Sequence, residues 1–478
     1  MKRSRLGSAL AVLAMLSSCG GGGGGGGGGP PTGSVPPPPA PTPPAPPPPP
    51  PATGCSVRAR QDWVLAQMRE WYLFPETLPA NLNPDAYPTV EGYLDALTAT
   101  ARAQGRDRFF SYLTSIKADE AFFNSGTMTG FGMRVVYDGG QKRVFVADAY
   151  QNAPAWNAEL RRTHEILAIG TSSGDMRLVS DLMASGGPQA VADAFGPETA
   201  GTTRVFRLAG GPGGSRDITL TKAQFTLVPI SFNGTVDYGA QKVGWINIRA
   251  FIGPTEQQLR SQFANSKPFP VTDYIVDLRY AGNRFSPVSE LLGDFLGAKR
   301  SSTDVMNFTT FRPEKSSNNK TRFFQPQPDS IGPERVAFIG SAGTGSGSEM
   351  LINSFVPYYH KAVGLVGSNT RGHPVGEISL DRAECDDRLR VVAFKIENAA
   401  RQGDYYDGLA SKMEASCAAA DDLNRGFNDI EEQSFAAALE FVRERSCAPI
   451  GAAGTGNPRQ LLMPERPTPV QHDMPGTF

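Results

Sequence analysis

A glycine-rich turn between a buried strand and a helix constrains this chain more than any other feature of its sequence. The apolar run over residues 336–339 predicts a strand, and apolar residues recur at helical spacing over residues 350–358. Between them lies GTGSGSE, residues 343–349. Further strands alternate with helices over residues 243–366, among them a helix over residues 287–296, so this part of the chain is expected to form an α/β sheet with crossover helices.

The turn puts Ser346 where a nucleophile functions well. At a helix N-terminus the backbone N–H groups lack intrahelical acceptors and the macrodipole favours negative charge, so the amide of Gly347 is a candidate oxyanion donor. An N-capping serine in an ordinary Gly/Ser-rich loop explains the same residues equally well. The turn is neither a nucleophile elbow nor a dinucleotide-binding fingerprint, because Thr344 and Ser348 stand where those motifs need glycine.

The amino terminus predicts export and a tether. Three basic residues precede the apolar run of residues 6–16, and residues 1–19 read as a secretory signal peptide. Its end, LSSC, resembles a bacterial lipobox, which implies a diacylglycerol on Cys19 and a lipid-anchored protein of the cell envelope, at the outer membrane facing the periplasm or the cell surface. Residues 20–54 are almost entirely glycine and then proline, so we expect an extended linker.

Charge and cysteine content narrow the possible partners. The formal net charge is -1, which gives no reason to expect nucleic acid. Four cysteines follow Cys19, and they allow three disulfide pairings in an exported protein; we favour Cys385 with Cys417 because both lie near turn signals. No cysteine pair has zinc-ligand spacing and the histidines do not cluster, so no metal and no cofactor are expected. The remaining cysteines are Cys55 and Cys447.

Composition and periodicity divide the folded region into three parts, so the predicted fold class is a multidomain α/β protein. Residues 55–125 have helical spacing and predict an amino-terminal helical domain. Residues 126–230 change to short β-rich segments with one helix near residues 179–184, and residues 231–450 form the α/β part, closed by an amphipathic helix over residues 430–445. Residues 451–478 lack periodicity and are rich in Gly and Pro, which predicts a disordered tail.

Several separated segments together resemble the carboxyl-terminal processing peptidases, or tail-specific proteases, a family of serine peptidases with an embedded PDZ domain. The resemblance covers nearly all of residues 55–447. It rests on the order and spacing of GFGM (130–133), EILAIGT (165–171), VDLRYAG (276–282), GTGSGSE (343–349), RGHPVG (371–376) and GDYYDG (403–408). It implies a PDZ-like β-rich domain over residues 126–230 and a crotonase-like ββα peptidase core over residues 231–450.

The family uses a serine nucleophile and a lysine base, and the resemblance carries the nucleophile to Ser346. Ser348 would already lie inside the helix. At the position of the lysine this chain has His373, which is chemically competent because a histidine is largely neutral at pH 7, although its side chain is shorter and Pro374 restricts its backbone. Glu349 matches a glutamate of the motif and is a candidate for orienting the base; an acidic residue favoured by the helix dipole explains it equally well.

The resemblance assigns the second oxyanion donor to the backbone of Gly282, in a loop where this chain has Asn283 and Arg284 instead of further glycines. It also implies that the PDZ-like loop binds the carboxyl terminus of polypeptide substrates, the peptide adding as a strand. That loop consists of Gly130, Phe131, Gly132 and Met133, and the resemblance implies that Phe131 and Gly132 offer their N–H groups to the peptide carboxylate.

The sequence leaves two functions open. One is a membrane-tethered serine endopeptidase with Ser346 and His373, and the other is a catalytically inactive lipoprotein that binds peptides or another ligand on the same scaffold. The other histidines are expected to be surface or structural residues; they are His164, His360 and His472.

Overall fold

The computed structural model describes residues 54–210, 214–238, 241–266, 271–282, 284, 287–451 and 459–478. The expected signal peptide, the lipid site at Cys19 and the tether lie outside the described residues, as does Asn283. In the described part of the chain, no helix combines the length and the apolar character that crossing a bilayer requires.

A six-stranded sheet forms the centre of the α/β part. The strand order is β10-β11-β12-β15-β16-β19, and the pairs from β11 to β19 are parallel, whereas β10 and β11 are antiparallel. The predicted strands and crossover helices of this region are confirmed. The strands are β10 (Ile230–Tyr238), β11 (Gln241–Ile248), β12 (Asp273–Asp277), β15 (Arg335–Gly340), β16 (Val363–Gly367) and β19 (Ser416–Ala418).

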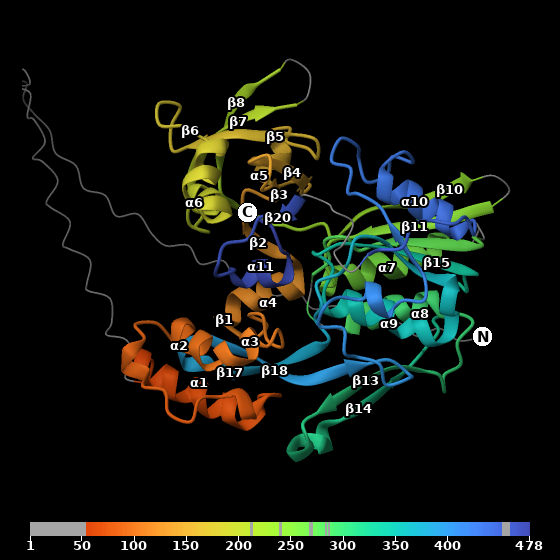
Figure 1. Cartoon of the computed structure of the whole chain (residues 1–478), viewed down its shortest axis with the longest axis horizontal. Helices are drawn as coiled ribbons and strands as arrows, with labels where there is room; N and C mark the ends of the chain where they lie inside the picture. Colours follow the sequence, from red (N-terminus) through yellow and green to blue (C-terminus); the bar gives the residue numbers. More distant parts are fainter. Residues whose placement is uncertain are drawn as a thin grey trace, which may run out of the picture. The chain divides into compact units, whose positions relative to one another are not determined.

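Helices cover both faces of this sheet (Figure 1). One face packs against α7 (Gly253–Ser266), α8 (Pro287–Leu296) and α9 (Ser346–Tyr359) through a large apolar core. The other face packs against α10 (Gln433–Val442), the helix expected over residues 430–445. Because parallel strands end at one edge of the sheet, the loops after β12 and β15 emerge side by side there.

A second sheet joins the amino-terminal segment to the α/β part. Its order is β1-β18-β13-β14, and β17 also pairs with β18. The helical segment forms as expected but has no separate core, because its apolar side chains pack directly on β17 and β18. The elements are α1 (Val57–Trp71), α2 (Val90–Leu97), α3 (Ala99–Ala103), β1 (Tyr112–Ser115), α4 (Ile116–Ser125), β13 (Val305–Phe311), β14 (Lys320–Phe323), β17 (Val375–Arg382) and β18 (Asp387–Glu397).

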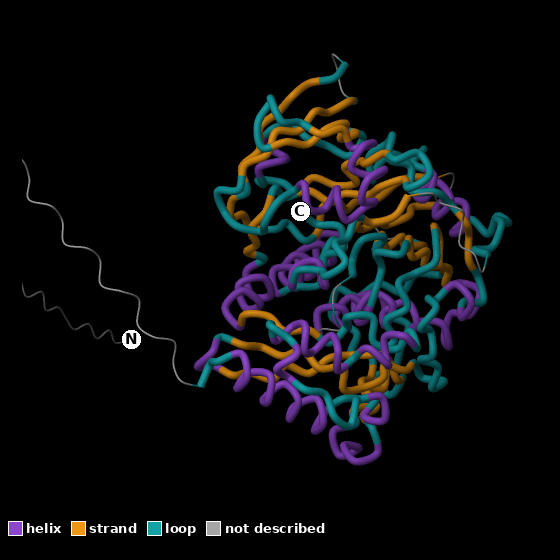
Figure 2. Tube along the Cα trace, turned by 60° about the vertical axis from the view of Figure 1, so that its left-hand side comes forward, coloured by secondary structure: helices purple, strands orange, loops and turns teal. Residues whose placement is uncertain are grey.

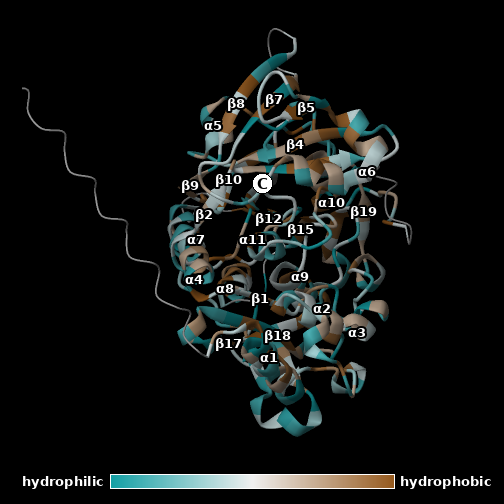
Figure 3. Ribbon diagram, turned by 90° about the vertical axis from the view of Figure 1, so that its left-hand side faces the viewer, coloured by the Kyte–Doolittle hydropathy of each residue, from teal (hydrophilic) through white to brown (hydrophobic). Residues whose placement is uncertain are grey.

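The β-rich segment forms a third sheet, ordered β20-β3-β4-β5-β7-β8, with β6 pairing β5 and a separate β2–β9 pair. Helix α6 packs on it, as Figure 3 also makes visible. The elements are β2 (Thr127–Gly130), β3 (Met133–Asp138), β4 (Arg143–Ala149), α5 (Pro154–Asn157), β5 (Glu165–Gly170), β6 (Arg177–Leu178), α6 (Val179–Ala194), β7 (Thr203–Ala209), β8 (Arg216–Thr221) and β9 (Ala223–Thr226).

The carboxyl-terminal segment is folded, so the expected disorder is wrong over residues 459–478. This segment contains β20 (Arg459–Leu461), which pairs with β3, and α11 (Pro469–Asp473), which has a capping box. In the view of Figure 2 the carboxyl terminus, marked C, has strands above it and helices below it. The segment has no apolar periodicity of its own and is ordered by contacts with other elements. Leu462 and Phe478, for example, are buried in the core of the third sheet.

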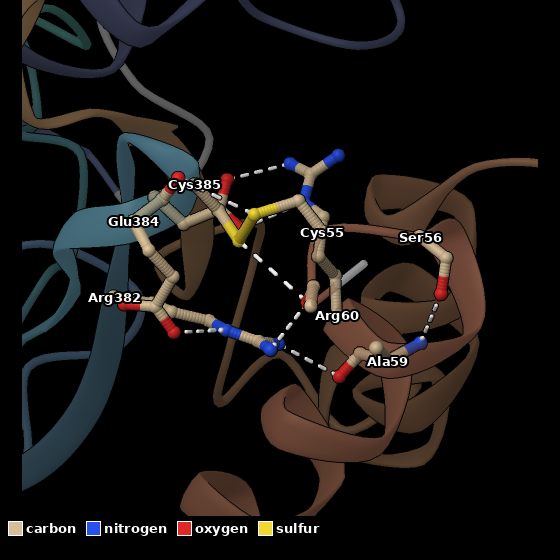
Figure 4. Close-up of a disulfide and its surroundings, with 9 residues drawn as sticks. Cys55, Ser56, Ala59, Arg60, Arg382, Glu384 and Cys385 are labelled. Atoms are coloured by element: carbon tan, nitrogen blue, oxygen red, sulfur yellow. Dashed lines mark hydrogen bonds and ion pairs between the residues drawn. A yellow bond between two sulfur atoms is a disulfide. The ribbon is translucent and has the colours of Figure 1, made fainter. Parts of the chain in front are cut away.

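Two disulfides correct the favoured pairing of Cys385 with Cys417. Cys385 pairs with Cys55, and Cys417 pairs with Cys447. Cys55 precedes α1 and Cys385 lies in the turn between β17 and β18, so the first bridge fastens the start of the helical segment to the second sheet (Figure 4). Proximity in the fold, which turn signals do not reveal, decides the pairing.

Candidate functional site

The turn that carries Ser346 is strained and fully buried. Gly345 is the N-cap of α9 and Ser346 is its first helical residue, with φ 37°, in the left-handed region that side chains other than glycine rarely adopt. Ser346 has no exposed surface. Backbone strain of this kind costs on the order of 1–3 kcal/mol and clusters at functional sites. Gly347 follows, where the helix geometry leaves the N–H without an intrahelical acceptor.

Hydrogen bonds join this turn to the loop after β12. The carbonyl of Ala281 accepts from the Gly345 N–H at 3.2 Å and from the Ser348 hydroxyl at 2.7 Å. Ser348 is therefore a structural residue of the turn. Gly282, the expected second oxyanion donor, lies beside the turn, but its N–H donates to the Tyr280 carbonyl at 3.1 Å in this structure. Its amide has to leave that carbonyl before it can contact an oxyanion.

A single buried carboxylate connects the serine turn to the segment of His373. Glu349 accepts from the Ser346 N–H at 3.1 Å, from the Gly372 N–H at 2.7 Å and from the His373 N–H at 2.8 Å. Burial raises the pKa of Glu349, and the hydrogen bonds from Thr370 and these amides oppose that rise. Glu349 thus holds the main chain of His373.

Two residues that sequence reasoning missed hold the ring of His373. Its Nε2 lies 2.8 Å from a carboxylate oxygen of the buried Glu377, and the Phe110 ring stacks on it with centroids 3.6 Å apart. Among the described residues, the buried Nδ1 has no hydrogen-bond partner. A carboxylate on Nε2 favours the tautomer in which Nδ1 is the basic nitrogen. The only sequence signal was an acidic residue four positions after the histidine.

Gly282 and His373 line the same small cavity, of about 10 Å³. Phe110, Glu377 and His472 line it too; His472 was expected to be a surface or structural residue, and here it lines a cavity. The remaining histidines lie elsewhere: His164 is buried against the Arg161 carbonyl, and His360 is exposed beside Glu414.

The predicted peptide-binding loop lies between β2 and β3. Gly130 ends β2, Met133 begins β3, and Gly132 has φ 76°, where an added Cβ would overlap Ala153. The Phe131 ring is buried in the sheet core. The N–H groups of Gly132 and Met133 both point to one main-chain oxygen, that of Phe478, at 2.9 and 3.2 Å. The expectation had named Phe131 and Gly132 as the donors.

Comparisons with known proteins find similarity to a peptidase family and to a processing peptidase. Residues 59–112 match the Peptidase S41 N-terminal domain. The chain is 25% identical over 241 residues to the chloroplastic C-terminal processing peptidase of Tetradesmus obliquus, and the match covers 48% of this chain. The sequence is therefore similar to peptidases of the S41 family over residues 59–112. The same match covers 47% of the algal protein, so the chain spans about half the length of that relative.

One solved structure has the same mixed α/β fold of several domains as this chain. A Bacteroides fragilis NCTC 9343 protein named as an S41 protease is 21% identical, with a TM-score of 0.61 over 80% of this chain and 97% of that chain. The photosystem II D1 C-terminal processing protease is 17% identical, with a TM-score of 0.47 over 76% of this chain and 93% of that chain.

A buried ion cluster fixes the loop that carries Gly282. Arg279, which is 1% exposed, lies 2.9 Å from Glu432 at the start of α10 and 2.7 Å from Asp421. Desolvating a guanidinium is unfavourable unless carboxylates surround it, and these carboxylates supply that environment. The loop geometry after β12 therefore depends on residues about 150 positions later in the chain.

Proposed function

We propose that the chain is a serine endopeptidase that cleaves polypeptides recognised through their carboxyl termini, with Ser346 as nucleophile and His373 as its base. One observation carries the proposal: the carboxylate of Glu349 accepts hydrogen bonds from the main chains of both residues, which holds the two segments together. The match to the Peptidase S41 N-terminal domain and the similarity to a protein named as a C-terminal processing peptidase support the same reaction class.

In the proposed reaction, Nδ1 of His373 takes the proton of the Ser346 hydroxyl as its oxygen attacks the scissile carbonyl carbon. The resulting oxyanion accepts hydrogen bonds from the Gly347 amide and, once released from Tyr280, from the Gly282 amide. The tetrahedral intermediate then collapses, the C–N bond breaks, and His373 gives its proton to the leaving amine. Water, deprotonated by the same imidazole, releases the acyl group from Ser346.

The carboxylate of Glu377 completes this assignment. It fixes the imidazole by its hydrogen bond to Nε2 and stabilises the positive charge that the ring acquires when Ser346 attacks. Glu377 would therefore orient the imidazole of His373 and stabilise its positive charge, two tasks that a lysine base does not require of a neighbouring carboxylate. In the same proposal, the six-stranded sheet with its helices is the crotonase-like core, and the third sheet with α6 is the PDZ-like domain.

The proposed location is the cell envelope, with the chain anchored through a lipid on Cys19. The signal-peptide pattern and the LSSC sequence support it, and the two disulfides suit an oxidising compartment. Cells given labelled palmitate should incorporate it into the parent chain and not into a Cys19→Ala variant. Equal incorporation in both would refute the lipid assignment.

A second candidate is a catalytically inactive peptide-binding protein on the same scaffold. Two observations favour it: Ser346 is fully buried, and the Gly282 amide is bonded to the Tyr280 carbonyl. In that case His373→Lys, which restores the family's base, would create activity that the parent lacks.

Labelling by a fluorophosphonate probe and cleavage of an unfolded protein test the peptidase directly. The parent should be labelled and active, and Ser346→Ala and His373→Ala should lose both properties. Ser348→Ala is the matched control, because it removes a hydroxyl from the same turn and should keep labelling. Labelling that persists in Ser346→Ala would refute the assignment of the nucleophile.

A further inference from the structure

Residues 459–478 contact both predicted functional regions of this chain. β20 pairs antiparallel with β3, the strand that begins at the predicted peptide-binding loop. The segment then passes through α11 and returns to the same strand, where Thr477 bridges Arg134. Figure 1 draws this segment in dark blue beside β2 and β3 and above β1 and α4. This segment therefore lies beside the candidate catalytic site and beside the predicted peptide-binding loop and β3, which together are called the groove.

Phe478, the last residue of the sequence, is bound in the manner of a peptide ligand. Its main-chain oxygen accepts from the N–H groups of Gly132 and Met133, and its own N–H donates to the Met133 carbonyl at 2.9 Å. The Phe478 ring is 3% exposed, with its centroid 4.4 Å from that of Phe195. Main-chain bonds along a strand combined with a pocket for a side chain are the features of β-augmentation.

The residues before Phe478 cover the candidate catalytic site. Pro475 lies against Gly282, where an added Cβ would come within 2.7 Å of its ring. Asp473 pairs with Arg284 at 3.0 Å. The backbone carbonyl of His472 accepts from Arg371, next to the segment of His373, at 3.2 Å.

The His472 ring also separates two cavities. It stacks on Tyr112 with centroids 4.0 Å apart, and both residues line the small cavity of His373 and a neighbouring cavity of about 430 Å³. Moving α11 away would join the larger cavity to the one beside His373. An extended polypeptide needs that space, because the small cavity is smaller than one peptide unit.

We propose that residues 468–478 are a ligand that the chain supplies to its own groove, and that they compete with polypeptide substrates for the groove and for the cleft beside Gly282. The groove consequently selects polypeptides with a large apolar side chain in the position of Phe478. This inference rests on the proposed function for its consequence, which is control of substrate entry. The occupancy itself is a binding property that requires no catalysis.

Competition in cis is effective because the tethered segment is present at a local concentration on the order of millimolar. A separate peptide must displace it before it can bind. A fluorescent peptide of residues 474–478 reports this displacement by polarisation, and a full-length Ser346→Ala chain prevents cleavage of the probe.

The test compares this chain with versions that also carry Phe478→Asp or Asp473→Asn. Phe478→Asp puts a charge into the Phe195 pocket, and Asp473→Asn weakens the contact with Arg284 without touching the groove. Both should bind the probe roughly tenfold or more tightly than the Ser346→Ala chain. Phe323→Asp, which changes an exposed Phe of β14, is the matched control and should not alter the affinity. Equal affinities in all four chains, or no binding of the probe to any of them, would overturn the proposal.

A second probe tests the selectivity. The same peptide with Asp in place of its terminal Phe should bind none of the chains, and equal binding of both peptides would overturn the apolar preference. The outcome for the proposed function is separate: if the tail variants bind the probe tightly while chains with an intact Ser346 cleave nothing, the peptidase assignment fails and the occupancy stands.

Discussion

Acidification should release the carboxyl-terminal segment, because its docked position keeps His472 neutral. Burial, together with the nearby Arg371, His373 and Arg284, lowers the pKa of His472 to about 3. The neighbouring carboxylate of Asp473 is engaged by Arg284 and does not compensate. When α11 leaves the cleft, the imidazole returns to solvent and to its usual pKa of 6.5.

The sign and the size follow from these two values. The released state binds a proton below pH 6.5, whereas the docked state does not until about pH 3, so docking is fully stable above 6.5 and weakens as the pH falls. Between pH 7.5 and pH 5.5 the docking free energy should fall by about 1.4 kcal/mol, which is roughly a tenfold change in the docking equilibrium.

The peptide of residues 474–478 measures this change, because it contains no histidine. Its apparent affinity for the full-length Ser346→Ala chain should rise up to about tenfold from pH 7.5 to pH 5.5, limited by the fraction of tail released. A chain that also carries His472→Gln has no imidazole to protonate and should lose most of this pH dependence. The same increase with and without His472 would refute the reasoning, since another group would then be responsible.

Three further perturbations test the site and the scaffold. Glu377→Gln should lower kcat roughly 10- to 100-fold with little change in KM, because a charge-assisted hydrogen bond contributes about 1.5–3 kcal/mol, and an unchanged kcat in steady-state cleavage would exclude its role. Replacing both Cys417 and Cys447 by serine should cost about 3–4 kcal/mol of unfolding free energy for a bridge across 30 residues, measured in urea, and a loss below about 1 kcal/mol would contradict this. Glu432→Gln should cost about 3 kcal/mol in the same assay, because it leaves Arg279 buried with fewer carboxylates, and unchanged stability would count against that cluster.

Local patterns predicted the elements of the fold well and their assembly less well. The strand over residues 336–339 and the helix over residues 287–296 follow from apolar periodicity, and the structure has both as β15 and α8. The helical segment was predicted as a separate domain because periodicity does not tell which partner an apolar face packs against. Here that partner is the β17–β18 pair, more than 250 positions away.

The residues of the candidate site likewise fall into those that local patterns predicted and those that only the assembled fold brings in. Ser346 and His373 stood out because each lies in a recognisable segment. Glu377 and Phe110 did not, since an isolated acid or phenylalanine carries no pattern, and their contacts with the imidazole arise only when distant segments meet. The tail was predicted to be disordered for a related reason. Its Gly- and Pro-rich sequence cannot form a hydrophobic core by itself, but its apolar residues are buried in the core of the third sheet.

With a histidine at position 373, the carboxyl-terminal segment can open and close the cleft with less effect on the base than if the base were a lysine. A lysine base has to be desolvated before it is neutral at pH 7, whereas the reference pKa of an imidazole is about 6.5, so a histidine base does not in general require a permanently dry cavity. The cleft can then open widely to admit a polypeptide and still retain a competent base. The burial of Ser346 and the small cavity beside His373 would in that case belong to the docked state and disappear when α11 leaves. Solvent exposure of the Ser346 turn should therefore rise together with probe binding in the Phe478→Asp chain, and hydrogen exchange of residues 343–349 that stays unchanged there would separate tail docking from access to the site.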